Sequence, residues 1–329
     1  MVMGLMGKQV KCIYRRLRVP FEWLGIALAL SVIPPLSLSG VLSLSRGLAD
    51  LGLFFDRRGR AVARANLRVM FGARMTPVRE RAILRRSYRN MTRVMINVFW
   101  MSRHTRARLD NLISMDPRVL DALRSNRPAV TVSAHLGNWE ILSQVCVIHG
   151  FPIMSIAKQI GSPRMTEHLV RLRSTIGQQL VPAEGALRPM LNALRHGTSL
   201  GLLVDQHTSV EDGGGWVTFF GLPACISLAP AALARKTKTA IIFAWSRPLK
   251  DGRYRIEPGE VYLPDPAVGD AERTQQLACA FERVIRRHPS LWCLNYRRWR
   301  YIRPGDDPAR YPFYARPLKR GANPGPSNG

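Results

Sequence analysis

The chain has 329 residues, of which 46% are hydrophobic and 22% are charged. This length allows one large domain or two small ones, and the hydrophobic content is too low for a protein with many membrane spans. The formal net charge is +27, and 42 of the 49 basic residues are arginine, so we expect an anionic partner: nucleic acid, anionic lipid, or an acidic protein or substrate.

The cysteine and histidine positions argue against a metal centre. None of the seven histidines stands in a His-x3-His or His-Glu-x2-His arrangement. The sequence therefore predicts no metal site, and we expect no cofactor. The five cysteines show no metal-ligand or redox spacing, so we expect buried, reduced thiols in a cytoplasmic setting. They are Cys12, Cys146, Cys225, Cys279 and Cys293.

The basic residues fall into three groups in which arginine predominates. Its planar guanidinium suits phosphate, so clustered arginine favours a phosphorylated partner. The alternative is a generally basic protein whose charged faces are only solvated. The groups are Lys8, Lys11, Arg15, Arg16 and Arg18, then twelve arginines from Arg57 to Arg93, and then Arg283, Arg286, Arg287, Arg297, Arg298, Arg300 and Arg303.

Residues 1–55 contain a basic start followed by an uncharged, apolar segment at residues 23–45. The segment is long enough to span a membrane, but Pro34-Pro35 in its middle would break a helix. We predict a membrane anchor that is either a broken span or two short interfacial helices, with the flanking basic residues at anionic headgroups. The alternative is a buried helical hairpin.

A helical region is expected at residues 56–127. Thr76-Pro77 reads as an N-cap followed by proline at the first helical position. After it, apolar residues recur at steps of three and four, which predicts one buried face of a long amphipathic helix. These residues are Leu84, Tyr88, Met91, Met95 and Val98.

From residue 128 to 303, short apolar runs alternate with helical patterns, which indicates an α/β domain with a mixed, mostly parallel sheet flanked by helices. The expected strands are Ala129–Val132, Pro152–Ile156, Leu200–Val204, Ala240–Ala244 and Tyr254–Ile256. The expected helices include Trp139–His149, Met165–Ile176, Ala186–Arg195, Leu228–Lys236 and Thr274–Arg287.

Two polar residues follow predicted strands of this domain directly. His135 comes after the strand at 129–132, and Asp205 comes after the strand at 200–204. Ligands bind at the carboxyl ends of strands in such sheets, so both are candidates for a catalytic or substrate-binding role. The remainder, residues 304–329, is rich in proline and glycine and is predicted to be disordered.

The stretch from Ser133 to Glu140 places one histidine and one carboxylate five positions apart. His135 could take a proton from a hydroxyl that attacks an acyl carbonyl, and Glu140 could orient its imidazole. Residues five apart do not share a helix face, so the two can meet only if His135 lies in a loop and Glu140 in the following turn. The alternative is a helix-capping histidine near an unrelated surface glutamate.

Further candidates for substrate contact are less specific. Phe219, Phe220 and Gly221 follow a glycine run, and this loop could line a pocket for a lipid chain, or its aromatics could anchor the core. Lys158 and Arg164 could each hold a phosphate or be solvated surface charges. Basic and aromatic residues interleave at 286–299, a pattern that suits a membrane interface or single-stranded nucleic acid.

Taken in order, these pieces resemble the bacterial lipid A secondary acyltransferases, the lauroyl and myristoyl transferases of the lysophospholipid acyltransferase superfamily. The similarity runs from about residue 20 to 303. It is carried by the apolar amino-terminal segment, Arg57-Arg58 through Asn66-Leu67, His135-Leu136-Gly137-Asn138-Trp139-Glu140, Asp205-Gln206, Phe219-Phe220-Gly221-Leu222-Pro223-Ala224, and the stretch from Arg286-Arg287-His288-Pro289 to Arg297-Arg298-Trp299.

The resemblance implies a glycerol-3-phosphate acyltransferase-like fold and acyl transfer at the cytoplasmic face of the bacterial inner membrane. The donor would be an acyl carrier protein thioester or acyl-CoA, and the acceptor a hydroxyl of an anionic, phosphorylated glycolipid. By position, His135 is the general base, Glu140 its partner, and Asp205 an acidic residue near the site. The family usually has arginine at the position of Lys158, so lysophospholipid, ornithine-type lipid and other glycolipid acceptors remain open.

Two other classes of function remain as alternatives. A basic nucleic-acid-binding protein would explain the charge, but it gives residues 23–45 no role, and no nucleic-acid-binding signature stands out. A catalytically silent membrane scaffold would share the fold, but the presence of both His135 and Glu140 argues against it. We therefore expect an acyltransferase that binds a membrane surface and no nucleic acid.

Overall fold

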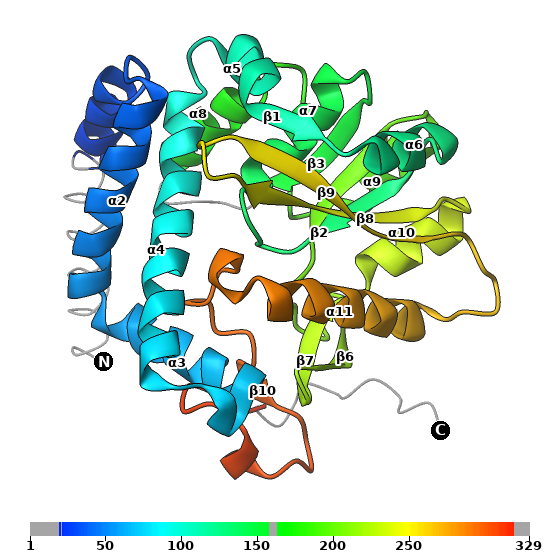
Figure 1. Cartoon of the computed structure of the whole chain (residues 1–329). Helices are drawn as coiled ribbons and strands as arrows, with labels where there is room; N and C mark the ends of the chain where they lie inside the picture. Colours follow the sequence, from blue (N-terminus) through cyan, green and yellow to red (C-terminus); the bar gives the residue numbers. More distant parts are fainter. Residues whose placement is uncertain (1–19, 21, 158–162, 319–329) are drawn as a thin grey trace, which may run out of the picture.

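The computed structural model describes residues 20, 22–157 and 163–318, and a seven-stranded sheet forms its centre (Figure 1). The strand order is β1-β9-β8-β2-β5-β3-β4, and neighbours are parallel except for β8 and β9. The predicted mixed, mostly parallel sheet flanked by helices is therefore confirmed. The strands are β1 (Ile113–Met115), β2 (Val130–Ser133), β3 (Ile153–Ala157), β4 (Gln179–Pro182), β5 (Ser199–Leu203), β8 (Ile241–Pro248) and β9 (Tyr254–Tyr262).

Helices cover both faces of the sheet. Successive strand residues point to opposite sides, so the sheet contributes to two separate cores. Val130 and Val132 belong to the core formed with α9, α10 and α11, whereas Ile242 and Ile256 belong to the core formed with α6 and α7. A parallel sheet covered in this way places its ligand site at the carboxyl ends of the strands. The helices are α6 (Pro117–Ser125), α7 (Leu142–Ile148), α8 (Pro163–Arg173), α9 (Leu187–Arg195), α10 (Ala229–Thr237) and α11 (Asp270–Arg287).

The five strands expected from apolar runs are all present, whereas the shorter or glycine-rich strands have no recognisable pattern in the sequence. β1 has only three residues, which is too short for a periodic signal. The hairpin of β6 (Gly214–Phe219) and β7 (Leu222–Ser227) begins inside the glycine run that was expected to be a loop. Its turn uses Phe220 and Gly221, with φ of 52° and 79°, which is the left-handed pair that a tight hairpin requires.

The apolar amino-terminal segment forms two helices separated by the proline pair. A shorter apolar helix, Glu22–Val32, ends before Pro34-Pro35, and α2 (Leu38–Phe55) follows with Ser37 as its N-cap. By length and composition α2 could cross a membrane, and it has a mean hydropathy of 1.3. It lies beside α4 (Pro77–Trp100), as Figure 1 shows, and buries Val41 and Ala49.

The long amphipathic helix expected after Thr76 is α4, whose N-cap hydroxyl accepts from the Arg79 N–H. The expected apolar stripe is wrong at Met95, which is 42% exposed, whereas Leu84 is buried as expected. The buried face instead includes Ser87 and Asn97. Their hydrogen bonds to other parts of the chain repay the cost of burial, so an apolar pattern alone places the face incorrectly.

Residues 304–318 are ordered, contrary to the prediction of a disordered tail from residue 304. Tyr311 and Tyr314 are buried against the main core, and Arg316–Pro317 (β11) pairs with Tyr301–Ile302 (β10). Two buried aromatic rings supply the apolar contact that the proline-rich composition conceals. The rest of the predicted tail lies outside the described residues.

Candidate active site

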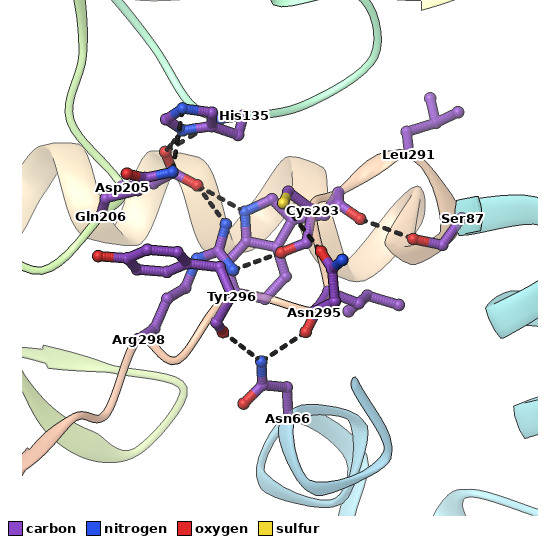
Figure 2. Close-up of polar contacts among 12 residues, drawn as sticks. Asn66, Ser87, His135, Asp205, Gln206, Leu291, Cys293, Asn295, Tyr296 and Arg298 are labelled. Carbon is purple, nitrogen blue, oxygen red and sulfur yellow. Dashed lines mark hydrogen bonds and ion pairs between the residues drawn. The ribbon is translucent and has the colours of Figure 1, made fainter. Parts of the chain in front are cut away.

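His135 and Asp205 lie side by side because they extend two neighbouring parallel strands in register. Ser133 of β2 is paired with Leu203 of β5, and each polar residue follows two positions later. One carboxylate oxygen of Asp205, Oδ1, accepts the backbone N–H of His135 at 3.0 Å and lies 2.6 Å from its Nδ1. The sheet therefore fixes both the backbone and the ring of His135 (Figure 2).

The other oxygen of Asp205 is held by two buried donors. Oδ2 accepts from Trp292 Nε1 at 2.8 Å and from Arg298 at 2.7 Å, and the Arg298 guanidinium lies 3.6 Å from the centre of the Trp292 ring. Burial by itself would raise the pKa of Asp205, but the charges of His135 and Arg298 and their hydrogen bonds hold this pKa well below its usual range. Asp205 is thus a buried, permanent carboxylate.

This carboxylate determines which nitrogen of His135 carries the proton. An ionised carboxylate only accepts hydrogen bonds, so the neutral imidazole must place its hydrogen on Nδ1 and its lone pair on Nε2. The side-chain nitrogen of Gln206 lies 3.1 Å from Nε2, which suits an amide N–H donating to that lone pair. His135 is therefore prepared to accept a proton at Nε2.

Polar residues of the amino-terminal helices hold the segment that carries Trp292 and Arg298. Asn66 of α3 (Arg57–Phe71) donates to the carbonyls of Leu294 and Tyr296, at 2.7 and 2.8 Å. Ser87 of α4 donates to the Trp292 carbonyl at 3.0 Å. Figure 2 shows the Asn66 contacts below the His135–Asp205 pair and the Ser87 contact to the right of it. The position of Asp205's partners therefore depends on helices far away in the sequence.

The turn after His135 requires a glycine. Gly137 has φ of 63°, and a Cβ atom there would lie 1.6 Å from the Ser246 carbonyl oxygen. The Gly137 N–H donates to the Leu291 carbonyl at 2.9 Å, and the side chain of Asn90 of α4 donates to the Gly137 carbonyl at 3.1 Å. This close approach to β8 and to the segment at 291 turns the chain away from the sheet directly after the histidine.

Glu140 lies in the turn after the loop, Trp139–Ile141, as the spacing argument required. The expected contact with His135 is nevertheless wrong. Within the described residues, the two oxygens of Glu140 accept from Arg173 of α8, at 2.7 and 2.8 Å, and both side chains are 15% exposed. Asp205 takes the place beside the imidazole, because the register of β2 with β5 brings together the residues that follow the two strands.

A cavity of about 330 Å³ opens beside His135 and continues under α6 and α7. Its mouth is polar and includes His135, Glu140, Arg173 and Gln206. Residues of β2 and β5 line the cavity as well, among them Thr131, Ser133 and Gly201. The rest of the lining is mainly apolar and includes Met115, Val119, Leu123, Leu142, Cys146, Leu203, Ile242 and Ile256.

A model of the bacterial lipid A biosynthesis acyltransferase family matches residues 8–301. The chain belongs to this family. The resemblance noted in the sequence is thereby confirmed, and the family identifies the chain as a lipid A biosynthesis acyltransferase. No curated protein matched the sequence.

The family motif at Phe219, Phe220 and Gly221 does not line this cavity. Phe219 and Phe220 are 2% and 4% exposed and belong to the main core, where both rings contact Trp292. The expected lipid-facing role is therefore wrong, and the alternative of aromatics that anchor the core is correct. Apolar residues beside a glycine loop fit both roles, so the sequence could not separate them.

The interleaved basic and aromatic stretch near the end of the family match is also largely internal. Trp292, Arg298 and Trp299 are between 0% and 2% exposed. These three side chains cannot stack on nucleic-acid bases or enter a membrane interface. This stretch, one of two sequence features that suggested nucleic acid, instead holds Asp205 in place.

Two candidate phosphate-binding residues cannot be placed. Lys158 lies outside the described residues. Arg164 lies in α8, but its side chain is outside the described part of the chain. Arg173, at the other end of this helix, is an arginine that lines the cavity in the described part of the chain. It occurs within an ordinary helical pattern, so nothing in the sequence distinguished it from a solvated arginine.

The cavity also contains a cysteine, Cys146 of α7. Burial raises the pKa of the Cys146 thiol to about 12, so this side chain is a neutral thiol near pH 7 and a poor nucleophile. Among the described residues, no group of three or more His, Cys, Asp or Glu side chains is arranged to hold a metal ion.

Proposed function

We propose that this family member is an O-acyltransferase. It transfers a fatty acyl chain from an acyl carrier protein thioester, or from acyl-CoA, to a hydroxyl of a lipid A precursor or a related phosphorylated glycolipid. The observation that supports this best is the His135–Asp205 pair, 2.6 Å apart, at the mouth of a mainly apolar cavity. It combines a proton acceptor with space for a hydrocarbon chain.

His135 acts as the general base in this proposal. Its Nε2 takes the proton of the acceptor hydroxyl as the hydroxyl oxygen attacks the thioester carbonyl carbon. Asp205 keeps the other ring proton on Nδ1 and stabilises the imidazolium that forms. Trp292 and Arg298 hold Asp205 in one orientation, so the ring is correctly oriented before the substrate arrives.

The acyl chain occupies the apolar part of the cavity, beneath α6 and α7. Val119 and Leu123 of α6 line its inner end together with Ile256 of β9. Burial of the hydrocarbon there favours binding by about 25 cal/mol for each Å² of apolar surface removed from water. Transfer is direct, since the Cys146 thiol in the cavity is neutral and an acyl-enzyme needs an activated nucleophile.

Glu140 contributes to the reaction indirectly, because it holds Arg173 in place. The bidentate ion pair holds the Arg173 guanidinium at the cavity mouth, beside the ring that does the chemistry. A guanidinium there suits a phosphate of the donor arm or of the acceptor headgroup. Arg173 and Glu140 are therefore positioning residues for an anionic substrate, a role that also fits the arginine-rich composition and an acidic carrier protein.

The two amino-terminal helices attach the enzyme to the cytoplasmic face of the inner membrane. Their outer surfaces expose large apolar side chains: Leu24, Leu28, Val32, Leu48, Leu51, Phe54 and Phe55. On the inner side of α2, Asp50 accepts from Arg85 and Arg89 of α4. A helix tied in this way to a charged neighbour favours lying along the interface over crossing the bilayer.

Mass spectrometry tests the proposal most directly. Purified enzyme is incubated with acyl carrier protein thioester and an under-acylated lipid A precursor, and the lipid is weighed. We expect a gain of one acyl chain with wild-type enzyme and none with His135→Ala. Near-wild-type turnover by the folded His135→Ala protein, or acylation of a lysophospholipid only, would overturn the proposal.

A further inference from the structure

The side-chain amide of Gln206 occupies the position that a substrate must take. Its nitrogen lies 3.1 Å from His135 Nε2, and the proposed reaction requires the acceptor hydroxyl to contact the same nitrogen at a similar distance. Both groups cannot donate to one lone pair in the same direction. The amide must therefore leave Nε2 whenever the hydroxyl binds.

The backbone of Gln206 is fixed on both sides, so only the side chain can move. Asp205 precedes it and is held by hydrogen bonds to His135, Trp292 and Arg298. After it, His207 forms a bridge with Ile226 of β7, and the Thr208 N–H donates to the Cys225 carbonyl at 3.1 Å. A displaced amide thus stays at the cavity mouth, which Gln206 lines.

We propose that Gln206 is the oxyanion donor of the acyl transfer, an inference that rests on the proposed function. In the structure its N–H faces Nε2 of the base. When the hydroxyl displaces it, rotation of the Gln206 side chain shifts the amide by about one hydrogen-bond length. The amide then donates to the carbonyl oxygen of the bound thioester. That oxygen is two atoms from the attacking oxygen, so a donor that has just left Nε2 is within reach of it.

The step is balanced without any further reactant. The hydroxyl oxygen bonds to the carbonyl carbon, its proton passes to Nε2, and the carbonyl electron pair moves to oxygen. Gln206 donates its N–H to this oxyanion. The carbonyl then re-forms, the carbon–sulfur bond breaks, and the leaving thiolate takes the proton from His135. The products are an ester and a thiol, and the imidazole returns to its starting tautomer.

Other side chains of the cavity carry N–H or O–H donors, among them Arg173, whose guanidinium is already paired with Glu140, and Ser133. The hydroxyl of Ser133 lines the cavity and is buried, with no hydrogen-bond partner in the part of the chain that the structure describes. Ser133 is the last residue of β2, two positions before His135. Gln206 is favoured because it already contacts the nitrogen at which the reaction begins.

The experiment compares two donors on purified enzyme: a fatty acyl thioester of acyl carrier protein, and the matching dithioester in which sulfur replaces the carbonyl oxygen. Sulfur is a weak acceptor, so an oxyanion donor makes the enzyme prefer the oxygen substrate. We expect Gln206→Met to lower kcat with the thioester about 10²–10³-fold at little change in KM. With the dithioester the loss should be much smaller.

Three results would overturn the inference. They are equal losses with both donors in Gln206→Met, a gain in rate because the base is no longer occupied, or loss of oxygen preference in Ser133→Ala with its retention in Gln206→Met. Gln206→Glu, which matches the native shape but lacks the N–H donor, provides a second variant if the methionine protein does not fold. Gln276→Met, on the outer helix α11, controls for the substitution itself and should leave both rates unchanged. Transfer by wild-type enzyme from neither donor would instead contradict the proposed function.

Discussion

Both carboxylate oxygens of Asp205 form hydrogen bonds at the site. One contacts His135, and the other accepts from Trp292 and Arg298. The sequence placed Asp205 near the site but did not pair it with the histidine, because the two residues are seventy positions apart. Only the pairing of β2 with β5 brings them together. The partner that sequence spacing suggested, Glu140, is occupied by Arg173.

We expect Asp205→Asn to lower kcat by about 10³–10⁴-fold, the range seen when an orienting aspartate is replaced by its amide. An amide N–H facing Nδ1 would favour the tautomer that carries its hydrogen on Nε2, which cannot accept the hydroxyl proton. Steady-state transfer assays measure this loss. A Glu140→Gln variant that loses more activity than Asp205→Asn would restore Glu140 as the direct partner.

The depressed pKa of Asp205 also predicts how stability depends on pH. The folded protein keeps this carboxylate ionised, whereas the unfolded chain protonates it near the ordinary value of 3.8. Its stabilising contribution is therefore complete above that value and is lost as pH falls below it. Denaturant titrations between pH 7 and 3 should show the unfolding free energy declining below about pH 4, with a smaller decline in Asp205→Asn.

At the scale of elements, the apolar runs located β2, β3, β5 and β8 because fully buried parallel strands are continuously hydrophobic. The same rule could not place the buried face of α4, where Ser87 and Asn97 replace apolar residues. These side chains hydrogen-bond to Trp292 and to Tyr254. Their role depends on long-range partners, which a periodic pattern does not contain.

Helix α6 should set the length of the transferred chain. Val119 and Leu123, one turn apart, line the inner end of the cavity, so Val119→Phe fills space that a long chain would use. We expect this variant to prefer shorter acyl donors while keeping its rate with short ones. Competition between donors of different length, read by product mass, measures the shift. An unchanged preference would place the chain elsewhere.

Across the whole molecule, the apolar residues of the first two helices form the surface proposed to meet lipid. Replacing Leu48, Leu51, Phe54 and Phe55 by serine removes four large exposed side chains of α2 without touching its buried face. We expect this variant to float free of anionic lipid vesicles in high salt, whereas the wild type stays bound. Replacement of the exposed Leu187 and Leu263, which lie outside these helices, by serine provides a control for the loss of exposed apolar side chains. If the wild type and the four-serine variant were released from the vesicles to the same extent, the proposed anchor would be contradicted.

The contacts between α2 and α4 have a consequence for anyone who wishes to handle this enzyme without detergent. Cutting away residues 1–55 would remove the Asp50 partner of Arg85 and Arg89 and leave one side of α4 bare. That helix, through Ser87, helps to hold the carbonyl of Trp292. A shortened, easily purified form would therefore hold Trp292, a hydrogen-bond partner of Asp205, less rigidly. Solubility and turnover cannot be engineered separately at this end of the chain.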